Sequence, residues 1–142
     1  MNKVDIFTDG GSRGNPGPAA VGAVIIIDGK SNKYGECIGK ATNNEAEYAA
    51  LIFALKKTKQ LIGKNKTKIT SLRCVSDSEL MVKQLNGEYK LKDENIQSNF
   101  VKIWNLKLDF ASVTFEHTRR ENNKEADSMV NEAFDRENSR MF

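Results

Sequence analysis

The sequence has few of the residues from which thiolate metal sites, disulfide frameworks and membrane spans are built. Its two cysteines, Cys37 and Cys74, lie far apart and have no histidine beside them, which argues against a zinc site or a disulfide framework. The longest apolar runs, Val24–Ile27 and Phe53–Leu55 with their neighbours, are far shorter than the roughly 20 residues that cross a bilayer. No basic segment followed by an apolar one opens the chain, so we expect a cytoplasmic protein with no membrane association.

A strong charge of one sign is also missing. The 22 lysines and arginines and the 19 acidic residues leave a net charge of +3, so any affinity for nucleic acid must come from a local patch. With 142 residues, 39% hydrophobic and 29% charged, the chain is long enough and apolar enough to fold around a core. We expect one domain over residues 1–137 and a C-terminal tail, 138–142, that has no clear period.

Two periodicities divide the chain into elements. Strands are expected at 3–8, 19–28, 34–40, 69–76 and 113–117, and helices at 44–59, 78–85, 95–108 and 123–135. Their order, βββαβααβα, predicts an α/β fold in which an antiparallel meander is extended by parallel strands. The result is a five-stranded mixed sheet with helices covering it.

Local signals support two of the helices. Thr42 followed three residues later by Glu45 is typical of a capping box and predicts the start of the first long helix. The helix expected at 95–108 carries its apolar residues on one face, namely Ile96, Phe100, Ile103, Trp104 and Leu108. We therefore expect that face to pack against the rest of the protein.

Four carboxylates fall at strand ends or helix starts. Asp9 and Asp77 follow the first and fourth strands, whereas Glu47 and Asp127 lie in the first turns of two helices. Strand ends and helix starts meet along one edge of an α/β sheet, so these acids can converge there. Such an all-oxygen site suits Mg²⁺ or Mn²⁺, and two metal ions can promote phosphodiester hydrolysis. Each acid alone also fits an ordinary turn or a favourable interaction with a helix dipole.

A loop rich in glycine and proline, Gly10–Pro18, follows Asp9 directly. A carboxylate beside backbone that carries few side chains is a suitable place for a metal ion and a polyanion. The same residues also fit an ordinary turn, because Asn15–Gly17 is a turn signal. The loop is not a Walker phosphate-binding loop, since no Gly-x-x-x-x-Gly-Lys motif occurs.

Five features in order along the chain resemble ribonuclease H of type 1, and the resemblance covers nearly the whole sequence. They are Thr8–Ser12, Gly14–Pro18, Thr42–Tyr48, Val75–Ser78 and a histidine, His117, ten residues before Asp127. The resemblance implies an RNase H-like fold. It also implies an endoribonuclease that hydrolyses the RNA strand of an RNA–DNA hybrid and leaves 5′-phosphate and 3′-hydroxyl ends.

A cofactor and a set of catalytic residues follow from the same resemblance. Asp9, Glu47, Asp77 and Asp127 would hold two Mg²⁺ ions, which Mn²⁺ can replace, with Asp9 bridging both ions. Glu47 and Asp127 would lie on opposite flanks of the pair, and Asp77 near the attacking water. His117 would assist proton transfer or product release from a mobile loop, as an auxiliary catalytic residue.

Further residues would bind the substrate. A protein can distinguish RNA from DNA through 2′-hydroxyl groups, which lie in a wide, shallow minor groove and suit contacts from exposed backbone and short polar side chains. The implied substrate-binding residues are Gly10, Gly11, Ser12, Arg13, Gly14, Asn15, Thr42, Asn43, Asn44 and Glu79. The glycines also fit a plain hairpin loop, and the residues from Thr42 onward also fit a helix cap.

Three features depart from the family pattern. Glu79 stands where many members carry glutamine, and an ionised glutamate cannot donate a hydrogen bond to a base edge. Residues 86–93 run straight on where larger members insert a basic helix and loop. Asp93 stands where members often have an asparagine of a phosphate pocket, a role that Asn95 can take after a small shift in alignment. The lysines between positions 56 and 68 form either a compensating basic patch or a solvated helix end.

Three alternatives stay open from the sequence. The first is the same chemistry on broader substrates, including double-stranded RNA or a single ribonucleotide in DNA. The second is a module that binds nucleic acid without cleaving it, which loss of an acid would mark, although all four acids are present. The third is another nuclease of the same superfold, such as an integrase or resolvase domain, which the Gly14–Pro18 loop and the Asn43–Asn44 pair disfavour. We expect an RNA–DNA hybrid as partner and a monomeric protein.

Overall fold

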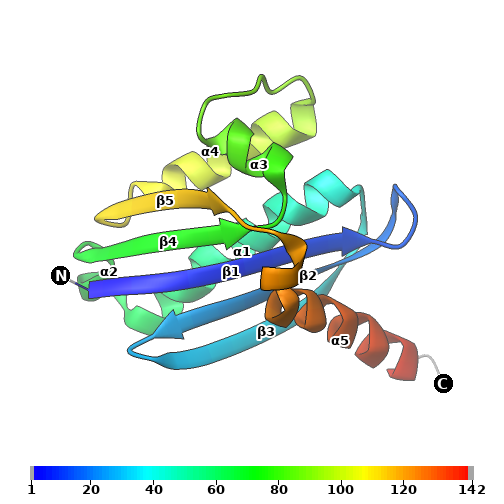
Figure 1. Cartoon of the computed structure of the whole chain (residues 1–142), viewed down its shortest axis with the longest axis horizontal. Coiled ribbons are helices and arrows are strands. Elements are labelled where there is room, and N and C mark those ends of the chain that lie inside the picture. The colour runs from blue at the N-terminus through cyan, green and yellow to red at the C-terminus, as the bar shows by residue number, and fades with distance from the viewer. Residues whose placement is uncertain (1, 141–142) are drawn as a thin grey trace.

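The computed structural model describes residues 2–140 and has a five-stranded sheet at its centre (Figure 1). The strands are β1 (Asn2–Ser12), β2 (Gly17–Ile27), β3 (Lys30–Ala41), β4 (Thr70–Ser76) and β5 (Ser112–His117). Their order across the sheet is β3-β2-β1-β4-β5. The first three strands pair antiparallel, and β4 and β5 run parallel to β1. The predicted α/β architecture with a mixed sheet is therefore confirmed.

Helices cover both faces of this sheet. They are α1 (Asn43–Ile62), α2 (Lys64–Thr67), α3 (Glu79–Leu85), α4 (Glu94–Lys107) and α5 (Lys124–Arg140), and a 3₁₀ helix, η1 (Arg120–Asn122), precedes α5. α1 packs on β1 and β2 and against α4, whereas α5 packs on β2, β3 and β1 from the other side (Figure 1). Helices on both faces leave β2 buried over most of its length, as its continuous apolar run predicts.

The larger core lies between the sheet and the helices α1, α3 and α4. Alternate residues of β1 point into it, and Ile6 is fully buried there together with Leu55 of α1. The Tyr48 hydroxyl, also buried, donates a hydrogen bond of 2.8 Å to Gln84 Oε1. A smaller apolar cluster lies under α5 and is formed by Ala20, Val130, Ala133 and Phe134. Within residues 2–140, no helix is both long and apolar enough to cross a membrane.

The first strand is longer than predicted. β1 continues through Ser12 because β2 begins at Gly17 and pairs with it up to the Ser12–Ala19 pair. Residues 10–12 of the expected loop are therefore strand, and only residues 13–16 connect β1 to β2. Asp9 consequently lies inside β1, so the expectation that it ends the strand was wrong. The parallel partner β4 does end at this level, because its last pair joins Ser76 to Thr8.

The start of α1 is the predicted capping box. Thr42 Oγ1 accepts a hydrogen bond of 3.1 Å from Glu45 N, and Glu45 Oε1 accepts one of 2.9 Å from Thr42 N. These bonds satisfy two main-chain donors that have no partner inside the helix. The box fixes where α1 begins and therefore which of its residues lie beside the sheet.

Other helices differ from the sequence-based expectation. α5 continues to Arg140, so residues 138–140 of the expected tail are helical, and residues 141 and 142 lie outside the described chain. In α4, Ile96 and Ile103 are buried, but Trp104 and Leu108 are 54% and 69% exposed. Phe100 and Leu106 are half-buried and pack against the same core as Ile96 and Ile103, so the expected apolar face is buried except for Trp104 and Leu108 at its edge. The short helices α2 and η1 were not predicted.

Candidate active site

The pairing of β1 with β4 places two of the four acids, Asp9 and Asp77, near each other. Asp9 lies one residue beyond the last β1–β4 pair, and Asp77 directly follows Ser76, the β4 member of that pair. Asp9 therefore keeps its β2 partner but has no β4 partner, and it borders the point where β4 gives way to Asp77. Carboxylate oxygens of Asp9, Asp77 and Glu47 all lie within 4.8 Å of one another.

A glycine allows α1 to bring Glu47 to this point. A Cβ atom at Gly10 would lie 2.2 Å from the carbonyl oxygen of Ala46, so the helix touches the strand backbone directly. At this close approach, Gly10 N donates a hydrogen bond of 2.8 Å to Glu47 Oε1. Any larger residue at position 10 would push Glu47 away from the acids.

A second glycine allows α5 to approach Asp9 from β2. Gly22 pairs with Asp9, and a Cβ atom there would lie 2.3 Å from the carbonyl oxygen of Ala126, next to Asp127. The start of α5 is also tied to β1, because the buried Asn123 Nδ2 donates a hydrogen bond of 2.8 Å to the carbonyl oxygen that precedes Asp9. Asp127 is thereby held beside Asp9.

All four predicted acids line one cleft of about 390 Å³. They come from β1, α1, the end of β4 and the start of α5, which are far apart in the sequence. The cleft is completed by Gly10, Gly11, Arg13, Asn43, Arg120, Val130, Asn131 and Phe134. The structure thus brings the four acids together with part of the predicted substrate-binding loop.

Two carboxyl groups of the cleft hold their protons unusually tightly. The pKa of Asp9 rises from 3.8 to about 8, chiefly because the group is buried and further because Asp77 and Asp127 are close. The pKa of Glu47 rises from 4.5 to about 9, again first through burial and then through Asp9 and Asp77. Hydrogen bonds from Gly10 N oppose both shifts without cancelling them.

Asp77 is less deeply buried and has cations near it. Burial and the charge of Asp127 raise its pKa, whereas the guanidinium of Arg120 and the ring of His117 lower it. Arg120 also lowers the pKa of Glu47, so this arginine faces the acids from η1. The two arginines of the cleft, Arg13 and Arg120, cannot neutralise four converging carboxylates, and a divalent cation would relieve the remaining repulsion. The donor set is purely oxygen, which fits Mg²⁺ or Mn²⁺.

The loop beside the acids is tied to the start of α1. Ser12 N donates a hydrogen bond of 2.9 Å to Asn43 Oδ1, and Asn43 N donates one of 3.0 Å to Asn15 Oδ1. Within the loop, Ser12 Oγ donates to the carbonyl oxygens of Gly14 and Gly17. These bonds hold the loop and the predicted asparagine pair as one surface beside the cleft.

Several predicted site residues lie outside the cleft. His117 is exposed at the end of β5, near enough to influence Asp77 but not lining the acid cleft. Glu79 is also exposed, and Lys83 Nζ holds its carboxylate at 2.9 Å, an interaction that lowers the pKa of Glu79. Thr42 is engaged in the capping box described above, and Asn44 is half-buried in the first turn of α1.

Two features that the sequence left open now have structural explanations. Asp93 caps α4, because its Oδ1 accepts hydrogen bonds of 2.7 Å from Asn95 N and 3.3 Å from Ile96 N. The lysines between positions 56 and 68 lie in the last turns of α1, in α2 and directly after it, at the end of the sheet away from Asp9 (Figure 1). There Lys59 pairs with Asp109 at 2.7 Å, which favours the interpretation as a solvated helix end.

Sequence reasoning missed four cleft residues, Arg120, Val130, Asn131 and Phe134. Arg120 lies in η1, a helix of three residues that is too short to show a period. Asn131 and Phe134 follow Asp127 by four and seven residues, a spacing that places all three on one face of a helix. That spacing was a usable signal, because a helix that presents one cleft residue presents others one and two turns later.

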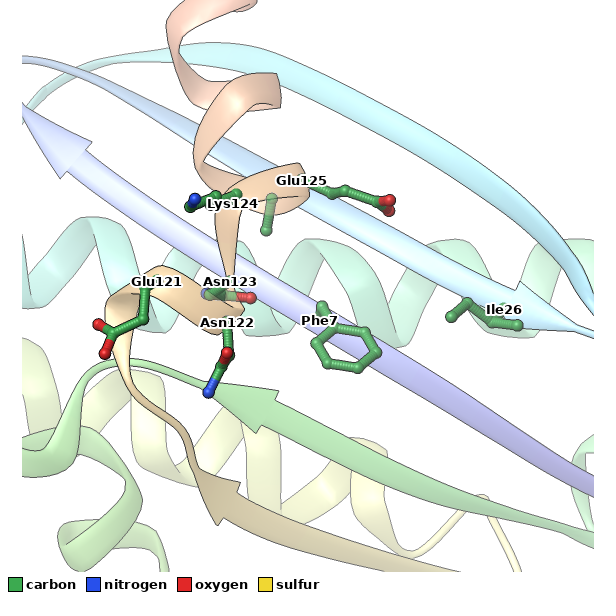
Figure 2. A pocket seen from close by; sticks show the side chains of 8 residues that line it. Phe7, Ile26, Glu121, Asn122, Asn123, Lys124 and Glu125 are labelled. Atoms are coloured by element: carbon green, nitrogen blue, oxygen red, sulfur yellow. The ribbon is translucent and has the colours of Figure 1, made fainter.

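A second hollow, of about 330 Å³, lies beside the start of α5 (Figure 2). Phe7 and Ile26 of the sheet contribute an apolar lining, and residues 121–126 contribute the rest. Figure 2 shows the carboxylates of Glu121 and Glu125 pointing to different sides of the hollow. Its acids do not converge and no predicted site residue lines it, so the acid cleft is the better candidate for chemistry.

Comparison with known proteins gives consistent matches. A family model described as reverse transcriptase-like matches residues 7–133. A ribonuclease HI of Halobacterium salinarum is 38% identical over 94% of this chain, which spans 65% of that protein. A bifunctional protein of Mycobacterium tuberculosis is likewise 38% identical over 94% of this chain, which spans only 36% of it. The chain therefore spans about two thirds or less of these relatives.

Two solved structures match this chain over nearly its whole length. The crystal structure of the Halobacterium salinarum RNase H1 has a TM-score of 0.86 and 38% identity, and the match covers 94% of this chain and 98% of that one. LC11-RNase H1, crystallised in complex with an RNA/DNA hybrid, has a TM-score of 0.87 and 40% identity, with 94% and 97% covered. The predicted RNase H-like fold is confirmed, and the chain belongs to the type 1 ribonuclease H family.

Proposed function

We propose that this protein is a metal-dependent endoribonuclease that hydrolyses the RNA strand of an RNA–DNA hybrid and leaves 5′-phosphate and 3′-hydroxyl ends. The observation that carries the proposal is the convergence of four carboxylates, three of them within 4.8 Å of one another, beside a preorganised polar loop. LC11-RNase H1, which was crystallised in complex with an RNA/DNA hybrid, supports the substrate.

Asp9, Glu47, Asp77 and Asp127 would hold two Mg²⁺ ions, which Mn²⁺ can replace. When bound, such ions activate the attacking water and stabilise the leaving oxygen of a phosphodiester. Asp9 lies centrally among these acids, because carboxylate oxygens of Glu47 and Asp77 lie within 4.8 Å of its own and Asp127 acts on its pKa. Its carboxylate and that of Glu47 must lose their protons before they bind a cation, so loading the site releases protons.

The β1–β2 loop and the start of α1 would recognise the RNA strand. Their exposed backbone and the side chains of Ser12, Asn15, Asn43 and Asn44 offer donors and acceptors that suit 2′-hydroxyl groups in a minor groove. The loop is already ordered by its hydrogen bonds to Asn43, so little ordering remains for the moment of binding. Gly11, which lines the cleft, adds no side chain to this surface.

His117 would act as an auxiliary residue. It ends β5 opposite Ser76 and therefore lies beside Asp77, whose pKa it lowers. An exposed imidazole at this position can carry a proton between the cleft and solvent. We expect its loss to slow turnover without abolishing it.

Double-stranded RNA is a second candidate substrate. One observation favours it: Glu79, at the position of a family base-edge donor, is ionised and held by Lys83 at 2.9 Å. Without that donor, recognition depends more on 2′-hydroxyl groups and backbone, which an RNA duplex shares with a hybrid. Discrimination against double-stranded RNA should therefore be weaker.

A cleavage panel tests these proposals. The substrates are a hybrid, an RNA duplex and a DNA duplex with one ribonucleotide, each incubated with EDTA, Mg²⁺ and Mn²⁺. We expect metal-dependent nicking of the RNA strand of the hybrid and near-complete loss of it in Asp9→Asn. The matched control is Asp109→Asn, which removes an exposed acid far from the cleft. Cleavage that persists in EDTA, or a fully active Asp9→Asn protein, would refute the proposed metal site.

A further inference from the structure

Two arginines line the acid cleft, and the guanidinium of one of them, Arg13, lies over an aromatic ring. Arg13 lines the cleft together with the four acids. Among residues 2–140, no aspartate or glutamate forms an ion pair with it. Its guanidinium carbon instead lies 4.2 Å from the centroid of the Phe134 ring. A cation beside four acids but paired with none of them is available to a second anion.

The ring under this guanidinium is held rigidly. Phe134 is only 7% exposed and packs with Ala20, Val130 and Ala133 beneath α5. It lies on the face of α5 that carries Asp127, seven residues earlier. The same helix therefore presents a metal-site acid and, two turns later, the ring on which Arg13 rests.

The backbone of Arg13 is equally well fixed. Arg13 N donates a hydrogen bond of 2.7 Å to the carbonyl oxygen of Pro18, across the four-residue connection between β1 and β2. A Cβ atom at Gly17 would lie 2.1 Å from the carbonyl oxygen of Arg13, so glycine is needed for this chain path. With the backbone set, only the long side chain is free to move, and Phe134 restricts it.

We propose that Phe134 is a positioning residue that holds the Arg13 guanidinium for a phosphate oxygen of the RNA strand, close to the scissile bond. Stacking uses the face of the planar group and leaves its N–H donors, which lie in the plane, to bind a phosphate in bidentate fashion. The inference rests on the proposed function, because it takes the ligand of the cleft to be a polynucleotide. In this proposal the loop residue Arg13 contacts the phosphate, and Phe134 of α5 supports Arg13.

The expected effect of removing the ring on KM follows from the conformational freedom of the Arg13 side chain. Without the ring, Arg13 must be immobilised when substrate binds, and this lost freedom should raise KM about 3- to 10-fold. The value of kcat should change less than about two-fold, since neither residue is a metal ligand. Phe134→Leu removes the ring but keeps an apolar side chain, whereas Phe134→Tyr keeps the ring and should retain the wild-type KM.

Salt dependence separates positioning from simple loss of charge. Arg13→Gln removes one phosphate contact, so the slope of log KM against log salt concentration should fall by roughly 0.8. Phe134→Leu keeps the charge and should raise KM at an unchanged slope. The effects on KM in the double variant should be less than multiplicative, because each substitution removes the same contact.

A matched control excludes a general loss of stability. Phe110→Leu makes the same change at a residue that is 6% exposed in the other core, away from Arg13, and should leave KM unchanged. Unchanged KM in Phe134→Leu, or multiplicative effects in the double variant, would overturn the inference while the hybrid is still cleaved. A wild-type protein that cleaves no hybrid with Mg²⁺ or Mn²⁺ would instead overturn the proposed function.

Discussion

Protons held in the acid cleft should make the metal-free protein less stable as pH rises. Asp9 and Glu47 have pKa values of about 8 and about 9 in the folded protein, against 3.8 and 4.5 as ordinary values. Between these limits the folded protein keeps protons that the unfolded chain has released. Stability therefore falls with increasing pH, and the loss is complete only above the folded-state values.

The size of this effect follows from the number of protons. Each proton that only the folded state retains changes the free energy of unfolding by about 1.4 kcal/mol per pH unit. With two such protons, we expect a decline of roughly 1 to 3 kcal/mol per pH unit between about pH 5 and pH 8. For a domain of this size, that corresponds to a fall in Tm of about 4 to 10 °C per pH unit.

Thermal unfolding in EDTA across this pH range measures the decline, and Mg²⁺ should reverse it. Because the cation competes with the two protons, the rise in Tm on adding Mg²⁺ should be larger at pH 8 than at pH 5.5. The variants Asp9→Asn and Glu47→Gln should each flatten the pH dependence, whereas Asp109→Asn should leave it unchanged. The reasoning fails if metal-free stability increases toward pH 8, or if the Mg²⁺ effect is the same at both pH values.

Four further substitutions, one of them a control, test the packing of the strands and helices. Gly10→Ala should reduce the free energy of unfolding, measured by urea denaturation, by about 2 to 3 kcal/mol, because its Cβ would lie 2.2 Å from the Ala46 carbonyl oxygen. The control is Gly11→Ala, whose Cβ meets nothing nearer than 3.8 Å and which should be tolerated. Tyr48→Phe leaves the buried Gln84 oxygen without its 2.8 Å hydrogen bond and should reduce the free energy of unfolding by about 1 to 2 kcal/mol. Trp104→Ser should change stability by less than about 0.5 kcal/mol because the ring is 54% exposed, and a larger loss would contradict the observed packing of α4.

Much of the architecture was predictable because each signal is local. The alternation in β1, the capping box of Thr42 and Glu45 and the helical spacing in α1 and α5 all act over a few residues. Local patterns also located Glu47, Asp77 and Asp127 at element ends, and the element order placed those ends at one sheet edge. Asp9 lies inside β1, but level with the end of its neighbour β4. The convergence of Asp9, Asp77 and Asp127 followed from these two facts, without knowledge of any contact.

The errors arose where a residue's state depends on a distant partner. Residues 10–12 look like loop because glycine and serine disfavour strands, yet β2 pairs with them through Ser12 and Ala19. Trp104 fits a helical apolar face, but which edge of that face is buried depends on the neighbouring elements, and the core takes up Leu106 while Trp104 stays exposed. α2 and η1 are too short to show a period of their own.

Two glycines near Asp9 show both a local sequence signal and a dependence on distant partners. In the sequence, Gly10 and Gly22 indicate only a turn or a weak point in a strand. In the structure they occupy adjacent strands at the level of Asp9, and each is the point where the backbone of a helix touches the sheet. α1 arrives at Gly10 with Glu47, and α5 arrives at Gly22 with Asp127. The acids therefore converge because the strand positions around Asp9 have no side chains to keep the helices away.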